Sequence, residues 1–77
     1  MAQDVVLPKL GMAMEEATII AWTKSVGERL AAGETLAQVE TDKAVLEIEA
    51  PTAGVLQEII QPEGAKVAVG TVLARIV

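Results

Sequence analysis

The sequence predicts an all-β fold, a flattened barrel or sandwich of eight short strands arranged as two similar halves. Three observations support this prediction: short β-branched and apolar runs, turn residues between them, and a pattern that returns after 37 residues. Apolar residues make up 52% of the chain but Trp22 is the sole aromatic, so the core is expected to consist of Val, Ile, Leu and Ala. At 77 residues the chain is expected to form one domain over residues 1–77.

The chain opens with a strand and a long loop. The first predicted strand covers residues 4–7 and ends before Pro8, which has no amide to donate to a sheet. Residues 9–16 are predicted to form a loop, broken by Gly11. Residues 18–22 are β-branched and apolar, which favours a second strand.

Turn residues separate the remaining strands. Turns at residues 25–27 and 32–34 enclose a two-residue strand, Arg29-Leu30. Two further turns are expected at residues 62–64 and 69–71. The other strands are predicted, in order, over residues 35–39, 45–49, 55–60, 66–67 and 72–76.

A hairpin is expected at the middle of the chain. The strand at residues 45–49 alternates apolar and acidic side chains, the pattern of a half-buried strand, and few residues separate it from the strand before it. Asp42 and Lys43 then occupy the tip. A type I turn fits these two residues, because no Gly is present to favour a primed turn. Lys43 is therefore expected to project into solvent from a fixed position.

An internal repeat supports the two-halved fold. The matched glycines matter most, because they mark turns whose backbone angles other residues resist. A second offset of 43 aligns Leu7-Pro8 with Ala50-Pro51, which leaves about six extra residues in the loop before Glu16. Two four-stranded halves related by a pseudo-twofold axis would bury their apolar faces against each other. A shift of 37 residues matches Gly27 with Gly64, Arg29 with Lys66, Ala31 with Ala68, Gly33 with Gly70, Leu36-Ala37 with Leu73-Ala74, and Val39 with Ile76.

Composition excludes several classes of function. The formal charge of −5 disfavours nucleic acid, and the sequence lacks both Cys and His, which removes thiol nucleophiles, imidazole bases and the usual zinc sites. No run is apolar and long enough for a membrane span, and the N-terminal residues lack the charged and apolar segments expected of a signal peptide. We therefore expect a soluble, monomeric protein in a reducing compartment: the cytoplasm, or the mitochondrial matrix for a eukaryotic protein.

Catalytic residue sets are not apparent in the sequence. Adjacent Glu15 and Glu16 are read as solvated loop charges, and Glu47 and Glu49 as the outward face of a strand. Met12 and Met14 have two interpretations, a contact surface or gap-filling residues under a loop. The chain is therefore predicted not to be an enzyme by itself.

The segment Glu40-Thr41-Asp42-Lys43-Ala44 resembles the lipoylation motif of lipoyl domains from 2-oxo-acid dehydrogenase complexes. Ala17 departs from the family, which often has Gly at this turn into a strand. The resemblance covers essentially the whole chain and includes Pro8-Lys9-Leu10-Gly11-Met12, Met14-Glu15-Glu16, Val26-Gly27, Ala32-Gly33, Glu49-Ala50-Pro51, Gly54, Pro62-Glu63-Gly64 and Val69-Gly70.

The resemblance implies two four-stranded antiparallel sheets and a carrier function. Lys43 would be amidated with lipoate by a lipoate ligase or an octanoyl/lipoyl transferase, which changes the formal charge from −5 to −6. In that family a thiamine-dependent 2-oxo acid decarboxylase, of a pyruvate dehydrogenase for example, reductively acylates the swinging arm. The acyltransferase catalytic domain passes the acyl group to coenzyme A, and a dihydrolipoyl dehydrogenase restores the disulfide. The absence of Cys and His fits this, because the cofactor supplies the sulfur.

The same resemblance implies roles for residues around Lys43. Asp42 and Ala44 would frame the lysine for the modifying enzyme, with Glu40 and Thr41 flanking that site. A loop that breaks the internal symmetry, and that lies near the lysine turn in the family, is a candidate contact for the decarboxylase. Its residues are Leu10, Gly11, Met12, Met14, Glu15 and Glu16.

Two alternative functions share the predicted fold. A biotin carboxyl carrier domain also has a lysine at the tip, but such domains have Met-Lys-Met there, whereas this chain has Asp42-Lys43-Ala44. An unmodified lipoyl-like adaptor module would lack the hairpin lysine. The sequence therefore favours lipoate over biotin, and a modified domain over an unmodified one.

Overall fold

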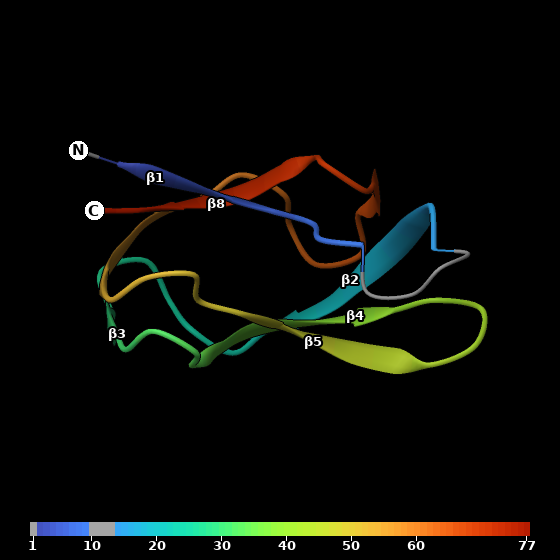
Figure 1. The fold of residues 1–77 in the computed structure, drawn as a ribbon, viewed down its shortest axis with the longest axis horizontal. Coiled ribbons are helices and arrows are strands. Elements are labelled where there is room, and N and C mark those ends of the chain that lie inside the picture. The colour runs from blue at the N-terminus through green and yellow to red at the C-terminus, as the bar shows by residue number, and fades with distance from the viewer. Residues whose placement is uncertain (1, 10–13) are drawn as a thin grey trace.

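The computed structural model describes residues 2–9 and 14–77. These residues form an all-β structure in which every strand pair is antiparallel, as the sequence predicted (Figure 1). Within the described part of the chain, no helix has the length and apolar character needed to cross a membrane. The strands are β1 (Gln3–Val6), β2 (Glu16–Trp22), β3 (Arg29–Leu30), β4 (Thr35–Glu40), β5 (Val45–Glu49), β6 (Gly54–Ile59), β7 (Lys66–Ala68) and β8 (Val72–Ile76).

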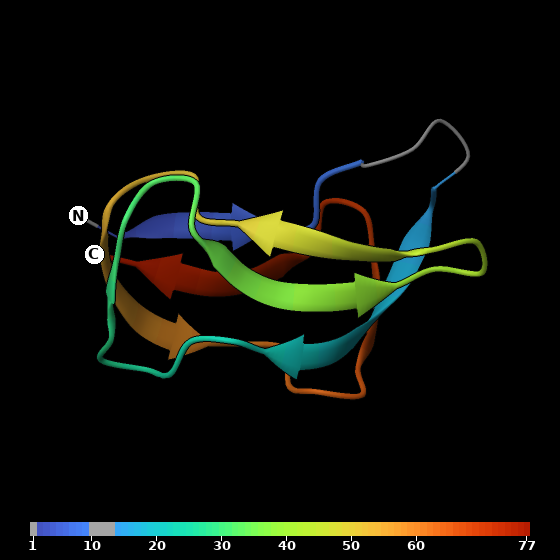
Figure 2. The ribbon, with the colours of Figure 1, turned by 90° about the horizontal axis from the view of Figure 1, so that it is seen from below.

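The strands form two four-stranded sheets that face each other. The β4 sheet has the strand order β5-β4-β2-β7, and the β8 sheet has the order β1-β8-β6-β3. The molecule measures 32 × 21 × 17 Å along its principal axes, and Figure 2 shows the strands running roughly along the longest one. This is the flattened sandwich expected from the repeat.

The space between the sheets is filled by aliphatic side chains. Among the described residues no polar or charged side chain is buried. Trp22 packs at the edge of this core, and its indole Nε1 donates a hydrogen bond to the Gln61 carbonyl oxygen at 2.9 Å. The largest fully buried side chains are those of Leu7, Ile19, Leu36, Val39, Ile48, Leu56, Leu73 and Ile76.

Backbone hydrogen bonds confirm the 37-residue repeat. The Gly27 amide donates to the Leu56 carbonyl oxygen at 2.8 Å, and the Gly64 amide donates to the Ile19 carbonyl oxygen at 2.6 Å. Leu56 follows Ile19 by 37 residues, as Gly64 follows Gly27. Both glycines have positive φ, +95° and +89°, a region that favours Gly. The two halves are therefore tied together by matched turns.

The second offset is also visible in the hydrogen bonds. Gly33 donates its amide to the Ala50 carbonyl oxygen at 2.8 Å, and Gly70 donates to the Leu7 carbonyl oxygen at 2.9 Å. Ala50 follows Leu7 by 43 residues, so the extra six residues of the first half lie between β1 and β2. The chain ends and the β4–β5 hairpin are equivalent under this symmetry, and they lie at opposite ends of the long axis (Figures 1 and 2).

Five of the eight expected strands differ from the structure by one or two residues at one or both ends, and β1 and β2 show the physical reason. The first strand ends at Val6, and Leu7, predicted to close it, exchanges hydrogen bonds with the turn before β8. The structure begins β2 at Glu16, which was expected in a loop, and continues it through Ala17, which was expected at the turn into a strand. Both residues belong to the strand because Glu16 pairs with Ala68 and Ala17 with Val67. Pairing with β7 therefore extends β2 beyond the β-branched run that indicated it.

Candidate functional site

Lys43 lies at the tip of the β4–β5 hairpin, as the sequence predicted. The ladder has five pairs, from Thr35 with Glu49 to Glu40 with Val45. Residues 41–44 connect the two strands and are called the lysine turn below. Figure 1 shows this turn at one end of the molecule, with both termini at the other. Lys43 is exposed, and a ladder of paired strands holds its base.

Thr41 shapes the lysine turn from within. Its amide donates to the Ala44 carbonyl oxygen at 2.8 Å. Its hydroxyl Oγ1 accepts hydrogen bonds from the Lys43 amide at 3.2 Å and the Ala44 amide at 3.1 Å, and donates to the Ala44 carbonyl oxygen at 3.2 Å. Thr41 was predicted only as a flanking recognition residue. The missed signal is the tendency of Ser and Thr hydroxyls to bond backbone amides two or three residues ahead.

The backbone of the lysine turn has the expected sign of φ. Among the described residues, positive φ values occur only at glycines, and the lysine turn contains none. Primed turns need a positive φ at their first central residue. Asp42 and Lys43 therefore follow the unprimed geometry predicted for them.

Two acidic residues flank the lysine in sequence, but none of the described acidic side chains forms an ion pair with it. Glu40 and Asp42 flank the turn and are exposed. Glu47 and Glu49 are exposed on the outer side of β5, while Ile48 between them is buried. These two acids are the solvated strand face that was predicted. Lys43 is thus exposed, and no described residue forms an ion pair with its amine.

The candidate partner loop is only partly described. Leu10, Gly11 and Met12 lie outside the described residues. Met14 is half-buried and packs against the core, which matches the gap-filling interpretation for this methionine. Glu15 is exposed and its carbonyl oxygen accepts a hydrogen bond from the Val69 amide at 2.9 Å. Glu16 belongs to β2 and its carboxylate lies 3.0 Å from Lys66 Nζ.

The arrangement suits covalent attachment of a carboxylic acid to Lys43. A primary amine at an exposed tip can reach the active site of a modifying enzyme and form an amide with little rearrangement of the fold. The paired strands behind it would fix the origin of an attached group, and the exposed turn would leave room for that group to move. The site supplies position and reach, which is the role a protein plays towards a cofactor that performs the chemistry.

Comparisons with known proteins agree with this arrangement. A family profile described as "Biotin-requiring enzyme" matches residues 3–76. The chain is 46% identical over 74 residues to the pyruvate dehydrogenase complex protein X component, mitochondrial, of Chaetomium thermophilum, covering 95% of this chain. It is 43% identical over 76 residues to the dihydrolipoyllysine-residue acetyltransferase component of the acetoin cleaving system of Bacillus subtilis, covering 99% of this chain.

A solved structure shows the same fold over almost its whole length. The lipoyl domain of the 2-oxoglutarate dehydrogenase complex from Azotobacter vinelandii superposes with a TM-score of 0.75 and 32% identity, covering 96% of this chain and 94% of that one. The two curated relatives are much longer than the chain described here, which spans 17% and 19% of their lengths.

Proposed function

The chain belongs to the biotin/lipoyl attachment family, and from this premise we propose that it is a lipoyl carrier domain with lipoate joined to Lys43. The observation that supports this most directly is the exposed lysine at the tip of a paired hairpin. The names of its relatives, which include a dihydrolipoyllysine-residue acetyltransferase component, and a lipoyl domain of the same fold favour lipoate. The family description also covers biotin, so biotin is the alternative that the experiment below must separate.

Attachment requires Lys43 to act as a nucleophile towards an activated lipoyl group. The amine of Lys43 attacks the carbonyl carbon, a C–N bond forms, and the activating group leaves with the electrons of its bond to that carbon. The amine gives up a proton, so the product amide is neutral. Because Lys43 forms no ion pair with the other described residues, no such pair has to be broken first.

Lipoate, when bound, supplies a dithiolane ring that can be reduced and acylated. The chain itself supplies a fixed origin for the arm, at the end of the β4–β5 ladder. Tethering keeps the ring at a high effective concentration near successive partners. The domain by itself is a carrier, and the reactions occur in partner active sites.

The proposed partners are the components of a 2-oxo acid dehydrogenase or acetoin cleaving complex. They comprise a thiamine-dependent decarboxylase, an acyltransferase catalytic domain and a dihydrolipoyl dehydrogenase. This proposal is supported by the names of the curated relatives, of which the chain spans less than a fifth. Lipoate ligase or an octanoyl/lipoyl transferase would act on the domain first.

Intact-mass measurement tests the proposal. The chain, produced with lipoate ligase and lipoate, is expected to gain the mass of one lipoyl group as an amide, and Lys43→Ala is expected to abolish the gain. Lys66→Ala, which removes another exposed lysine, is the matched control and should leave the gain unchanged. A biotin increment with biotin ligase, or no lipoyl increment on the unaltered chain, would show that the proposal is wrong.

A further inference from the structure

The hydroxyl of Thr41 is fully used inside the lysine turn. A hydroxyl offers one donor and two acceptor positions. The Lys43 and Ala44 amides occupy the two acceptor positions, and the Ala44 carbonyl oxygen receives the donor. A side chain so engaged with its own backbone has no hydrogen-bonding position left for another protein.

Packing does little to fix the rest of the turn. Asp42, Lys43 and Ala44 are all exposed, and only Thr41 is half-buried. The turn also has no residue with positive φ, so it does not adopt the primed geometry that matches the twist of two-residue hairpins. The Thr41 hydroxyl takes part in three of the four hydrogen bonds recorded within the lysine turn.

The internal symmetry does not supply a substitute. The Gly27 amide donates to Leu56 in β6 and the Gly64 amide donates to Ile19 in β2, so each of these two turns is fixed by a strand of the other half. The equivalent of the lysine turn is the end of the molecule where the two termini lie (Figure 1). Thr41 thus stabilises a turn that occurs once in the fold and presents the proposed attachment lysine.

We propose that Thr41 is a positioning residue for the modification of Lys43, and that it acts through the Lys43 and Ala44 amides rather than by contact with the modifying enzyme. This inference depends on the proposed function. Holding both amides on one oxygen keeps the lysine turn in a single conformation. Nearly every molecule then has the conformation that the modifying enzyme recognises. Without the hydroxyl, the fraction of molecules in that conformation falls, and the apparent KM for the domain rises in inverse proportion to that fraction.

Replacements at Thr41 separate the hydroxyl from the rest of the side chain. Thr41→Val keeps the shape and loses the hydroxyl, whereas Thr41→Ser keeps the hydroxyl and loses the methyl group. Thr41→Asn keeps an acceptor oxygen able to bond the Lys43 amide. Lipoylation by an ATP-dependent lipoate ligase is measured on the 77-residue chain as a function of domain concentration. Thr41→Val is expected to raise KM roughly five- to twentyfold with kcat within about twofold, and Thr41→Ser and Thr41→Asn to stay within roughly threefold of the unaltered chain.

Amide hydrogen exchange supplies a second readout. The Lys43 and Ala44 amides should be protected in the unaltered chain and in Thr41→Ser, and exchange faster in Thr41→Val, while the β4–β5 ladder amides remain protected.

Unchanged KM in Thr41→Val would overturn the inference. A loss in Thr41→Ser equal to that in Thr41→Val would also overturn it, because the methyl group would then be the recognised part. Should Thr41→Val fail to fold, Thr41→Asn decides, and a KM raised more than about fivefold there counts against the inference. Failure of the unaltered chain to accept lipoate would instead refute the proposed function.

Discussion

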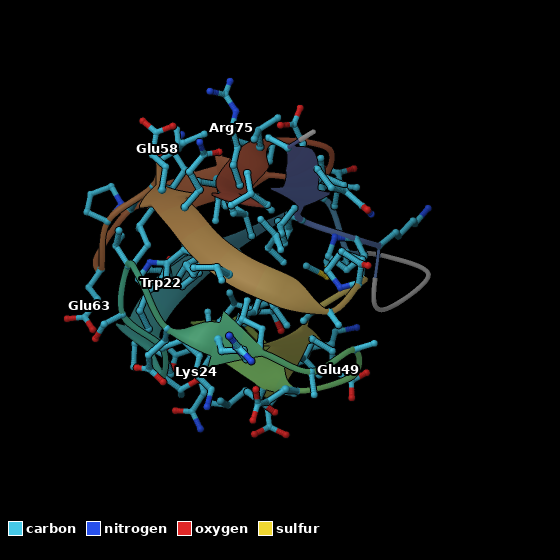
Figure 3. All side chains as sticks on the ribbon, turned by 90° about the vertical axis from the view of Figure 1, so that its left-hand side faces the viewer. Trp22, Lys24, Glu49, Glu58, Glu63 and Arg75 are labelled. Carbon is cyan, nitrogen blue, oxygen red and sulfur yellow. The ribbon has the colours of Figure 1, made fainter. Side chains whose placement is uncertain are left out.

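Arg75 and Gln38 occupy equivalent positions in the two sheets, but Arg75 lies between two carboxylates and Gln38 does not. Arg75 is opposite Asp4 on β1 and Glu58 on β6, and its guanidinium lies 3.2 Å and 3.4 Å from their oxygens. Gln38, 37 residues earlier, is opposite Glu47 and Ala21. Figure 3 shows Arg75 and Glu58 on one outer surface and Glu49 on the opposite side. In the β8 sheet a cation thus lies opposite both acids, while in the β4 sheet Glu47 lies opposite the uncharged Gln38.

This difference predicts opposite results for two substitutions. Arg75→Gln should lower the free energy of unfolding by about 1 kcal/mol or less, because exposed pairs contribute little, and 1 M salt should shrink the loss. Gln38→Arg should raise it by a similar or smaller amount by facing Glu47. Urea unfolding at low and high salt measures both. A loss above about 2 kcal/mol in Arg75→Gln would show that its packing matters more than its charge.

Asp42→Ala should separate recognition from folding. The side chain is exposed at the tip, so the free energy of unfolding should change by less than about 0.5 kcal/mol. Recognition by the proposed modifying enzyme or decarboxylase should be impaired, because Asp42 adjoins Lys43. Denaturation and a reductive acylation assay measure the two effects, with Glu47→Gln as the control for loss of one negative charge. A large loss of stability would assign Asp42 a structural role instead.

Leu36 and Leu73 should be equally important to the core. They are matched by the repeat, and each has a fully buried side chain with 0% exposure. Replacing either with Ala should cost about 2–5 kcal/mol, through lost burial and a residual cavity. A domain of this size is stabilised by roughly 4–12 kcal/mol, so either variant should show a large fall in its urea midpoint. A difference of more than about 2 kcal/mol between the two variants would contradict equivalent packing of the halves.

Glu34 should contribute to the acid side of the stability profile. The Ala31 amide, then Lys24, hold the pKa of this carboxyl below its ordinary value of 4.5. The folded state therefore binds a proton here less readily than the unfolded state does. The resulting stabilisation is present above pH 4.5 and is lost as the pH falls through the lowered value. Glu34→Gln should flatten the unfolding profile below pH 4.5, and an unchanged profile would contradict this assignment.

The repeat could be predicted from the sequence because few residues other than Gly adopt the positive φ of these turns, and few side chains other than Leu fill the matched core positions. Matched Gly27 and Gly64 make matched hydrogen bonds, and β3 and β8 have the bounds that were expected. Register shifts between Ile19 and Ala21, and at the equivalent point of β6, were not predicted. A one-residue bulge in a strand leaves no Gly or Pro signal when the extra residue is an ordinary one.

Ala17 is a position where the internal repeat does not predict which residue the structure requires. Its equivalent in the second half is Gly54, where an added Cβ would meet the Val77 carbonyl oxygen and lie 2.7 Å from Ile76 Cγ2. Ala17 is buried within β2. The two positions thus differ in how closely a neighbouring strand approaches, which depends on tertiary packing and cannot be read from either residue. The departure at Ala17 leaves the lysine turn as predicted.

Thr41 is the site residue whose role was underestimated, since the motif drew attention to Lys43 and its immediate neighbours. A hydroxyl two positions before a turn residue is a local signal that sequence analysis could have used. The partner loop could not be judged in the same way, because Leu10, Gly11 and Met12 lie outside the described residues.

The pseudo-twofold axis has a mechanical consequence for a carrier. It sets the tip of the β4–β5 hairpin, which carries Lys43, and the two chain ends at opposite ends of a body 32 Å long (Figure 1). Any polypeptide joined to either terminus would be attached at the end of the domain farthest from Lys43. The folded domain would therefore add its own length to that of the group carried on the lysine. The volume accessible to the group carried on Lys43 would then depend on the length of the folded domain as well as on the flexibility of the linker.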